Sequence, residues 1–564
     1  MGKTVAVGIQ DFKTMIQNDC FYIDKTDFIK KWWENKDHVT LITRPRRFGK
    51  TLNMSMLECF FSIKYQGQGE IFQNLSIWKE KKYRELQGTY PLLFLSFANI
   101  KEQNQSDAME SIKSNLVALY NENRFLLEEG FLNPVECEQF TSVKMDMSNV
   151  TAAKSIYFLC SYLSKYYNKR VIILMDEYDT PLQEAYVNGY WKEQVSFIRN
   201  LFNSTFKTNP YLECAVMTGI TRISKESLFS DLNNLKIVSM TSDKYASCFG
   251  FTETEVFAAM DEYNLTNKED VKAWYDGFTI GNIKDIYNPW SIINFLDERK
   301  LKPYWANTSS NTLAGNLIQK GNRNIKMQFE DLLQQRSIRS VIDEEMVFNQ
   351  LDDNDESAVW SLLFTSGYLK VVEIQNDVYE LKLTNYEVRK MFENMVRGWF
   401  DKNSADYNDF IKALLKGDVE EMNAYMGEVA ESVFSFFDVG EKPSVRAPER
   451  FYHGFVLGLL VDLRDRYEVL SNRESGFGRY DVMLKPLNDT DDGIILEFKV
   501  YNPKKEKDLE ETVQNALRQI DDKKYEQTLL SYGMSEERIR KYGIAFRGKE
   551  VLIESTPSLQ AAGC

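Results

Sequence analysis

The segment Thr43-Arg44-Pro45-Arg46-Arg47-Phe48-Gly49-Lys50-Thr51 joins a short apolar run to a stretch with helical periodicity. The run before it, 39–42, reads as a strand. The stretch after it repeats apolar side chains at near-helical spacing: Leu52, Met54, Met56, Leu57, Phe60 and Phe61. A strand, a loop ending in Gly-Lys-Thr and a helix are the context of a phosphate-binding loop. The segment therefore predicts a nucleotide site at which backbone N–H groups and a helix N-terminus face the phosphates.

The residues of this loop have distinct expected roles. Lys50 would contact the β- and γ-phosphates, and the hydroxyl of Thr51 would bind Mg²⁺. The cofactor-binding residues expected in the loop are Arg46, Arg47, Phe48, Gly49, Lys50 and Thr51. Arg44 stands where the motif usually begins with glycine. Glycine permits close approach of the backbone, so a loop that begins with arginine can differ in geometry from the common form. Arg44, Arg46 and Arg47 add positive charge that could meet phosphates. The alternative is a basic loop that only caps a helix, because Gly-Lys-Thr triplets also occur by chance.

A second apolar run, 171–175, ends in the acid pair Asp176-Glu177. At the end of a buried strand, Asp176 would hold Mg²⁺ directly or through water, and Glu177 would polarise the attacking water. The alternative is a buried strand followed by an acidic helix start at Asp179-Thr180-Pro181. The acid pair together with the phosphate loop favours binding of ATP with Mg²⁺, and its hydrolysis.

Two further candidates follow the run 215–219. Thr218, at the expected end of a strand beside the acid pair, is a candidate for sensing the γ-phosphate. Arg222 is a candidate for stabilising transition-state charge, in cis or in trans. The alternative is equally suitable: Thr218 would be an ordinary polar residue at the end of a strand, and Arg222 an ordinary surface arginine.

The order of apolar runs and helical stretches predicts an α/β fold. Near-continuous apolar runs at 39–42, 91–97, 171–175 and 215–219 suit strands of a parallel sheet flanked by helices. We expect three parts: a P-loop domain over 1–245, a mostly helical linking module over 246–395, and a region over 396–564. This last region reads as a helical lead-in followed by strand–turn–strand, helix and strand.

Composition narrows the class of protein. The 564 residues suffice for roughly two to four domains, and 43% hydrophobic with 27% charged residues is typical of a folded soluble protein. No apolar run of about 18 residues and no secretory signal is found, so we expect a cytoplasmic protein without a membrane partner. Seven scattered cysteines and two histidines argue against a disulfide framework and a structural zinc site. The net charge of −14 weakens a broad cationic surface for nucleic acid but leaves a local basic groove open.

A third constellation lies near the carboxyl terminus. Asp481 opens one expected strand, and Glu497 and Lys499 lie on a second strand, 494–500, after a polar turn. Strand side chains alternate, so Glu497 and Lys499 share a face, and a hairpin can bring Asp481 beside them. Two carboxylates can bind Mg²⁺ or Mn²⁺, and a lysine can position or help deprotonate a hydrolytic water. The alternative is a solvent-facing edge strand with ion pairs.

Residues 8–65 resemble the predicted AAA-ATPase-like family of bacteria. The resemblance rests on Gly8-Ile9-Gln10-Asp11-Phe12, Tyr22-Ile23-Asp24-Lys25-Thr26 and the segment 44–51. Two later motifs extend the match beyond this range: Leu174-Met175-Asp176-Glu177-Tyr178-Asp179 and Ser230-Asp231-Leu232-Asn233-Asn234. It covers roughly the first half of the chain and implies a P-loop ATPase fold with an additional strand. In that family the arginine at the position of Arg44 is normal.

Residues 449–525 resemble the PD-(D/E)XK nuclease domain that commonly follows such an ATPase domain. The matching positions are Tyr452-His453, Ser471-Asn472-Arg473-Glu474, Gly478-Arg479-Tyr480-Asp481, Glu497-Phe498-Lys499 and Gln519-Ile520. The resemblance implies a restriction-endonuclease-like α/β domain with Asp481, Glu497 and Lys499 as catalytic residues and Gln519 as an additional polar one. Asp481 and Glu497 would bind the metal. His453 or Glu449 is either an auxiliary ligand or substrate contact, or a core or capping residue.

The main hypothesis is an ATPase fused to a metal-dependent nuclease, with the nucleotide state controlling access to DNA or RNA. The second hypothesis is a non-catalytic, ATP-dependent switch whose carboxyl-terminal domain binds a partner protein or nucleic acid. AAA-type ATPases often assemble, so formation of a homo-oligomer belongs to either hypothesis.

Overall fold

The computed structural model describes residues 2–221, 229, 232–306, 312–343, 351, 355–398, 404–427, 455–456, 458–459, 461–475, 478–547 and 550–556. The chain forms two compact units, Met1–Leu313 with Ser337–Arg389, and Ala314–Arg336 with Lys390–Cys564. Residue 245, an expected boundary, lies inside the first unit, and the segment 314–336 groups with the second. These two units are defined by contacts and do not test the predicted division into the domains 1–245, 246–395 and 396–564, which stays a prediction.

The first unit contains a five-stranded parallel sheet with the order β2-β3-β4-β1-β5. Its strands are β1 Val39–Thr43, β2 Leu92–Ser96, β3 Val171–Asp176, β4 Leu212–Gly219 and β5 Leu235–Val238. All residues of β1 and β3 are buried, as predicted for strands covered on both faces. Strand β4 lies between β1 and β3, which is the additional strand that the resemblance implies. The α/β prediction is confirmed for this region.

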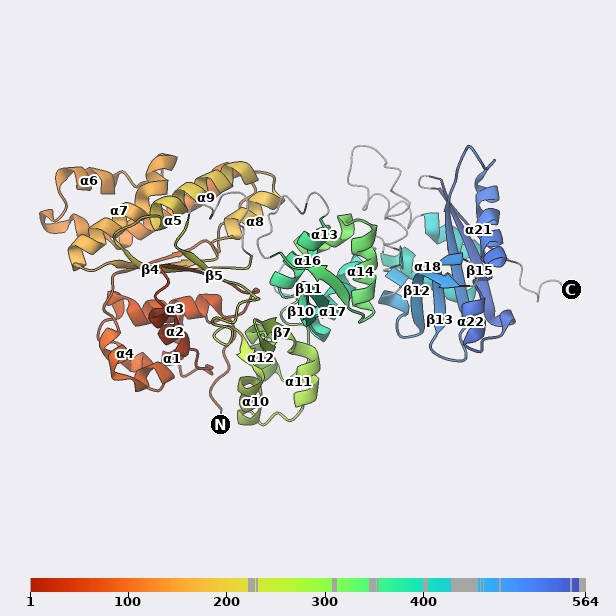
Figure 1. Cartoon of the computed structure of the whole chain (residues 1–564), viewed down its shortest axis with the longest axis horizontal. Coiled ribbons are helices and arrows are strands. Elements are labelled where there is room, and N and C mark those ends of the chain that lie inside the picture. The colour runs from red at the N-terminus through yellow and green to blue at the C-terminus, as the bar shows by residue number, and fades with distance from the viewer. Residues whose placement is uncertain are drawn as a thin grey trace. The chain divides into compact units, whose positions relative to one another are not determined.

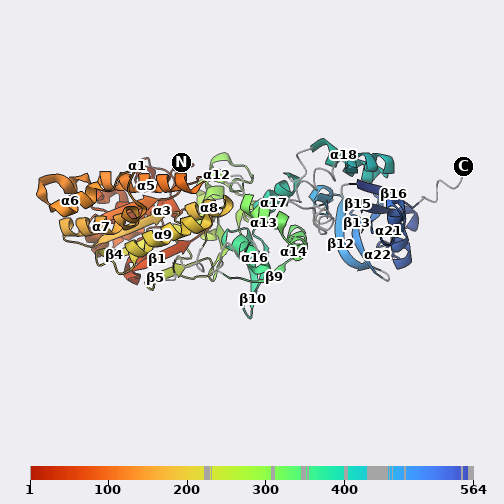
Figure 2. The ribbon, with the colours of Figure 1, turned by 90° about the horizontal axis from the view of Figure 1, so that it is seen from above.

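Helices cover both faces of this sheet (Figure 1). On one side lie α1 Phe12–Gln17, α2 Asp27–Asn35, α3 Lys50–Phe61 and α4 Lys81–Leu86. On the other lie α5 Gln105–Glu122, α6 Pro134–Thr141, α7 Asn149–Tyr167, α8 Thr180–Val187 and α9 Trp191–Phe206. Short 3₁₀ turns occupy 63–65, 69–72, 76–79 and 124–130. Figure 2 shows α5, α7 and α9 crossing the sheet side by side, and the packing of α7 on both α5 and α9 agrees with this view.

The rest of the first unit mixes helices with two small antiparallel sheets. The helices are α10 Glu253–Glu262, α11 Lys268–Tyr275, α12 Pro289–Glu298, α16 Glu356–Thr365 and the start of α17 Tyr386–Gly398. One sheet has the order β6-β8-β7, with β6 Phe251–Thr252, β7 Phe278–Ile280 and β8 Ile283–Tyr287. The other has the order β10-β11-β9, with β9 Ile338–Val341, β10 Leu369–Gln375 and β11 Val378–Leu383. The region expected to be mostly helical thus also contains two three-stranded sheets.

The second unit contains a mixed sheet with the order β12-β13-β14-β15-β16. Its strands are β12 Tyr467–Ser475, β13 Gly478–Pro486, β14 Gly493–Val500, β15 Ile539–Arg547 and β16 Glu550–Ser555. Its helices include α13 Thr312–Lys320, α14 Arg323–Leu333, most of α17, α18 Ser404–Lys416, α21 Leu509–Lys523 and α22 Gln527–Ser531. Strands β14 and β15 pair in parallel, and α21 packs on both of them as the crossover between them. Among the described residues, no helix is both long and apolar enough to span a membrane.

Candidate active sites

The loop between β1 and α3 has the backbone shape of an anion-binding turn. Arg47 and Gly49 both adopt positive φ, 63° and 78°, and α3 begins directly afterwards at Lys50. Turns with left-handed residues expose successive backbone N–H groups, and a helix N-terminus adds further unpaired donors. The backbone shape of this loop therefore suits the phosphate-binding role that the sequence predicts.

The side chain of Arg44 points away from this turn. Its guanidinium is fully buried and donates hydrogen bonds to the carbonyl oxygens of Thr43 at 2.8 Å and Ser239 at 2.7 Å. The expectation that Arg44 adds charge at the phosphates is therefore wrong. Burial of an arginine requires polar partners, and the backbone carbonyls beyond the end of β5 supply them. Arg44 instead ties the start of the loop to the segment after β5.

The ammonium of Lys50 lies inside the loop. It donates to the carbonyl oxygens of Arg44 at 3.0 Å and Pro45 at 2.9 Å. Burial lowers the pKa of Lys50, while the nearby carboxylates of Glu177 and Asp176 favour its charged form. Backbone oxygens of the loop thus hold the lysine close to Asp176, at the end of β3, and to Glu177, which follows it.

Three predicted residues from three elements meet at the carboxyl edge of the sheet. The hydroxyl of Thr51, on α3, donates to Asp176 Oδ2 at 2.7 Å, and the hydroxyl of Thr218, on β4, donates to Asp176 Oδ1. Burial raises the pKa of Asp176, and both hydroxyls counteract that rise. Ends of neighbouring parallel strands share one edge, which is why these side chains converge.

Glu177 stands beside this cluster in a strained backbone conformation, with φ of 52°. Its N–H donates to the Thr218 hydroxyl at 3.4 Å, and its carboxylate accepts from the Thr180 hydroxyl at 3.3 Å. Positive φ is uncommon for a non-glycine residue and is concentrated at functional sites. Arg222, the other candidate of this region, lies outside the described residues.

Asp179 has a role that sequence reasoning missed. It precedes α8 but makes no capping bond to that helix; instead Oδ2 accepts the N–H groups of Ile220 at 2.9 Å and Thr221 at 3.0 Å. Burial raises the pKa of Asp179, and these N–H groups counteract that rise. The side chain therefore joins the segment after β3 to the segment after β4. The only signal in the sequence was a further acid so close to the acid pair.

Residues far along the chain form the outer wall of the loop. The carbonyl oxygen of Arg46 accepts from the side-chain amide of Asn288 at 3.2 Å and from the indole N–H of Trp305 at 3.1 Å. The Arg47 guanidinium lies 4.4 Å from the centre of the Trp290 ring, a cation–π contact. Sequence reasoning found none of these wall residues, because no local pattern links them to the loop.

The wall is completed by a buried aromatic contact and a buried acid. Phe48 packs edge-on against Phe278 with ring centres 4.8 Å apart. Glu387 is 1% exposed and accepts the Ser291 hydroxyl at 2.7 Å and the backbone N–H of Trp305. Burial raises the pKa of Glu387 to about 7. This acid fixes both the helix α12 and the segment that carries Trp305.

In the second unit, Asp481 and Glu497 lie on adjacent strands. The register pairs Val482 with Leu496, which places Asp481 across from Glu497, and Asp481 Oδ2 accepts the N–H of Phe498 at 2.8 Å. Lys499 follows on the same face of β14 as Glu497. The structure therefore brings the three predicted residues together, as the hairpin reasoning required.

Gln519, on α21, joins the members of this cluster. Its amide nitrogen donates to Glu497 Oε1 and to the Tyr525 hydroxyl at 3.0 Å, and its amide oxygen accepts from Lys499 Nζ at 2.7 Å. Burial and the nearby Asp481 carboxylate raise the pKa of Glu497, while Lys499 favours its ionised form. A single amide thus orients both the acid and the lysine.

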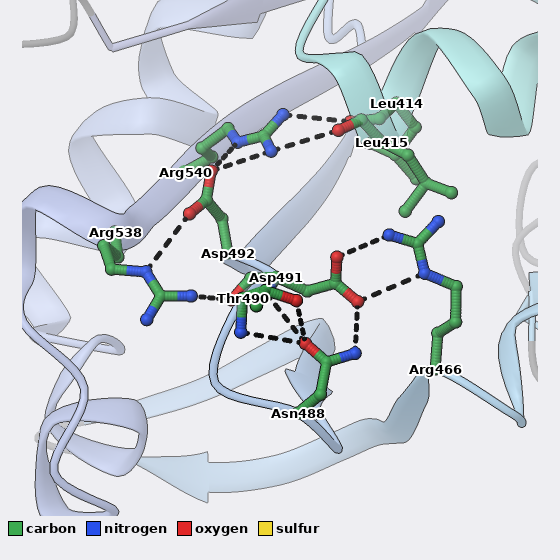
Figure 3. Close-up of polar contacts among 9 residues, drawn as sticks. All are labelled: Leu414, Leu415, Arg466, Asn488, Thr490, Asp491, Asp492, Arg538 and Arg540. Carbon is green, nitrogen blue, oxygen red and sulfur yellow. Dashed lines mark hydrogen bonds and ion pairs between the residues drawn. The ribbon is translucent and has the colours of Figure 1, made fainter.

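The turn between β13 and β14 is held by a separate polar network (Figure 3). Arg466 Nε donates to Asp491 at 3.1 Å, and Arg540 Nε donates to Asp492 at 2.9 Å. Asn488 Oδ1 accepts the N–H of Asp491 at 2.9 Å, and Arg540 also donates to the carbonyl oxygen of Leu415 at the end of α18 at 3.1 Å. A slip of one residue would turn Glu497 to the other face, so this network helps to hold the register that places Asp481 across from Glu497.

The donor set of the cluster fits a divalent cation. Glu497 Oε2 is buried and has no hydrogen-bond partner in the described part of the chain, and the Asp481 carboxylate lies across from it. A hard cation such as Mg²⁺ or Mn²⁺ prefers carboxylate oxygens. Among the described residues no group of three or more Asp, Glu, His or Cys side chains is arranged for a metal. Glu449 and His453, and the side chains of Arg473 and Arg479, lie outside the described residues.

Two families of known proteins match this chain, one over the region of the phosphate loop and one over the region of the Asp481–Glu497 cluster. Residues 6–229 match the family described as predicted AAA-ATPase, and residues 447–556 match a family of the PD-(D/E)XK nuclease superfamily. The chain carries an AAA-ATPase-like domain and a PD-(D/E)XK nuclease-superfamily domain. An uncharacterized protein from the vnfD 5' region of Azotobacter chroococcum mcd 1 is 26% identical over 394 residues, which covers 69% of this chain and 68% of that protein. Both resemblances inferred from the sequence are confirmed.

Proposed function

We propose that the AAA-ATPase-like domain binds and hydrolyses ATP with Mg²⁺ and that the PD-(D/E)XK domain cleaves phosphodiester bonds of nucleic acid. The observation that carries the nuclease assignment is the convergence of Asp481, Glu497 and Lys499, with Gln519 bridging the last two. A solvent-facing strand of ion pairs is a poor explanation, because Glu497 is only 3% exposed.

At the ATPase site, the described side chains suit the roles expected of them. Lys50 would exchange its contacts with loop carbonyls for phosphate oxygens, which bind an ammonium more strongly because they are charged. Thr51 and Asp176 would hold Mg²⁺, which neutralises phosphate charge. Glu177 would orient the attacking water, and Thr218 would keep the Asp176 carboxylate in place.

At the nuclease site, Asp481 and Glu497 would hold Mg²⁺ or Mn²⁺. A divalent cation in such a site acts as a Lewis acid and favours ionisation of water near neutral pH. Lys499 would position the hydrolytic water and balance negative charge on the phosphate. Gln519 would keep the lysine and Glu497 on the same side of the scissile bond.

The first test is incubation of the full chain with labelled single- and double-stranded DNA and RNA, with Mg²⁺ or Mn²⁺, in the presence and absence of ATP. Wild type, Glu497→Ala, Lys50→Ala and the exposed-site control Glu510→Ala are compared. We expect cleavage by wild type and Glu510→Ala, loss of cleavage in Glu497→Ala, and loss of phosphate release from ATP in Lys50→Ala.

The same experiment distinguishes the alternatives. Cleavage that persists in Glu497→Ala would contradict the nuclease assignment. No cleavage by wild type on any substrate, together with nucleotide-dependent capture of nucleic acid or protein, would favour the non-catalytic switch. Cleavage in wild type that requires ATP and fails in Lys50→Ala would support control of the nuclease by nucleotide state.

A further inference from the structure

The segment that joins β14 to α21, residues 501–508, concentrates positive charge beside the nuclease cluster. Lys504, Lys505 and Lys507 are all exposed, and in the described part of the chain none of their ammonium groups pairs with a carboxylate. We call residues 501–508 the lysine loop. Three solvated cations in four positions are notable in a chain whose net charge is −14.

The two acids of the lysine loop are engaged in hydrogen bonds to neighbouring groups. Glu506 accepts the N–H of Asn502 at 2.8 Å, the Thr512 hydroxyl at 3.0 Å and the side-chain amide of Asn515 at 3.0 Å. Asp508 caps α21 by accepting the N–H of Glu511 at 2.9 Å. These carboxylates are occupied with backbone and amide donors, so the outer surface of the loop is left to the lysines.

The conformation of the loop is fixed by its own hydrogen bonds. Asn502 Oδ1 accepts the N–H of Lys504 at 3.1 Å, and the Tyr501 hydroxyl donates to the carbonyl oxygen of Lys507 at 3.3 Å. Glu511 accepts the N–H of Lys507 at 2.7 Å. A loop ordered in this way loses less entropy when its lysines bind than a flexible one would.

A continuous set of contacts places the loop next to the catalytic residues. Asn515, which holds Glu506, lies one turn before Gln519 on the same face of α21. Gln519 contacts both Glu497 and Lys499, and the loop begins two residues after Lys499. The loop that carries the lysines therefore lies beside the cluster proposed as the nuclease site.

We propose that the lysine loop binds the phosphate backbone of the nucleic-acid strand that enters the nuclease site, without regard to base sequence. This proposal rests on the nuclease function proposed above. Lysine contacts phosphate as a point charge and carries no sequence information, so the loop supplies affinity and orientation. A membrane surface is the less suitable partner, because no large apolar residue of the loop is exposed for insertion.

The test measures binding of the full chain to fluorescein-labelled single- and double-stranded DNA and RNA of several sequences, in EDTA, over a series of salt concentrations. The variant K504Q/K505Q is compared with K523Q/K524Q, which removes two exposed lysines from the far end of α21, about 20 Å away. We expect K504Q/K505Q to weaken binding about tenfold or more and to lower the slope of log K against log salt by about 1.4 to 1.8. K523Q/K524Q should change binding less than about twofold.

Each other outcome has a defined meaning. Equal losses in both variants would overturn the proposal in favour of diffuse electrostatic attraction. Unchanged binding by K504Q/K505Q, with cleavage still abolished by Glu497→Ala, would overturn the lysine loop alone and leave the nuclease assignment standing. Failure of wild type to bind or cleave any strand would overturn both. Loss of binding to anionic phosphatidylserine vesicles, with nucleic-acid binding unaffected, would assign the loop to a membrane surface instead.

Discussion

The indole N–H of Trp305 donates a hydrogen bond to the carbonyl oxygen of Arg46 over a separation of 259 residues. A residue of the region beyond the parallel sheet thereby holds the backbone of the phosphate loop in its turn. We expect Trp305→Phe, which keeps an aromatic ring but removes the donor, to weaken ATP binding about fivefold, as loss of one hydrogen bond of about 1 kcal/mol predicts. Calorimetric titration with ATP measures this directly.

The control for that variant is Trp274→Phe, in which the altered ring packs on Tyr386 with ring centres 4.7 Å apart. It should bind ATP as wild type does. If both substitutions weaken binding equally, general loosening of the unit explains the effect and the specific contact with Arg46 does not.

The hydroxyl of Thr218 supports the Asp176 carboxylate, so its removal should impair ATP hydrolysis. We expect Thr218→Val, which keeps the shape of the side chain, to reduce the rate of phosphate release about tenfold. Thr218→Ser retains the hydroxyl and should keep most of the activity. Comparable rates in the valine and serine variants would show that the hydroxyl contributes nothing to the reaction.

Substitution of Lys499 should impair nucleic-acid cleavage without affecting the ATPase site. We expect Lys499→Ala to abolish nucleic-acid cleavage and to leave ATP binding unchanged, because its contacts lie within the second unit. Cleavage assays and nucleotide titration on the same preparation test both parts. Residual cleavage near the wild-type rate would remove Lys499 from the reaction.

Arg540 should stabilise the hairpin that carries Asp481 and Glu497. Its guanidinium bonds Asp492 and the carbonyl oxygens of Leu414 and Leu415, so Arg540→Met should weaken the local structure by about 1–3 kcal/mol. Hydrogen exchange of β13 and β14 amides should become faster. Arg547→Met, on the same strand as Arg540, removes a solvent-exposed ion pair with Glu550 of β16, which contributes little to stability, and serves as the control. Equal exchange in the two variants would contradict this role of Arg540.

The buried Glu387 predicts a pH dependence of stability. Burial raises its pKa from 4.5 to about 7, so the folded protein binds more protons than the unfolded chain between these values. The free energy of unfolding should therefore fall as pH rises through this window, by roughly 3 kcal/mol in total, and level off above it. Glu387→Gln should flatten this dependence, measured by urea unfolding from pH 5 to 8. A slope identical to that of the exposed-site variant Glu262→Gln would contradict the prediction.

Local patterns in the sequence were sufficient for strands β1 to β4 of the parallel sheet, the phosphate loop and the acid pair, but not for β5 or the two small antiparallel sheets. Buried parallel strands are near-continuous apolar runs, and Gly49-Lys50-Thr51 or Asp176-Glu177 occupy fixed positions at strand ends. Alternation along β14 likewise placed Glu497 and Lys499 on one face. The assignment of Gln519 came from the family resemblance, because nothing in the local pattern of α21 relates this residue to β14.

Other features could not be derived from local patterns. The direction of the Arg44 side chain depends on carbonyl groups almost 200 residues away, and the role of Asp179 depends on where the segment after β4 lies. The wall residues Asn288, Trp305 and Glu387 are polar or aromatic residues of ordinary type, so only their packing distinguishes them.

The order of the residues therefore specifies which groups can do chemistry: a phosphate loop, an acid pair, and a strand bearing Glu497 and Lys499. These are short-range features, since helical and strand periodicity act over a few residues. The three-dimensional fold specifies which of them meet and what surrounds them. Long-range contacts place Thr218 on Asp176, Gln519 between Glu497 and Lys499, and the lysine loop beside them, because side chains from separate elements converge only after the sheets have formed.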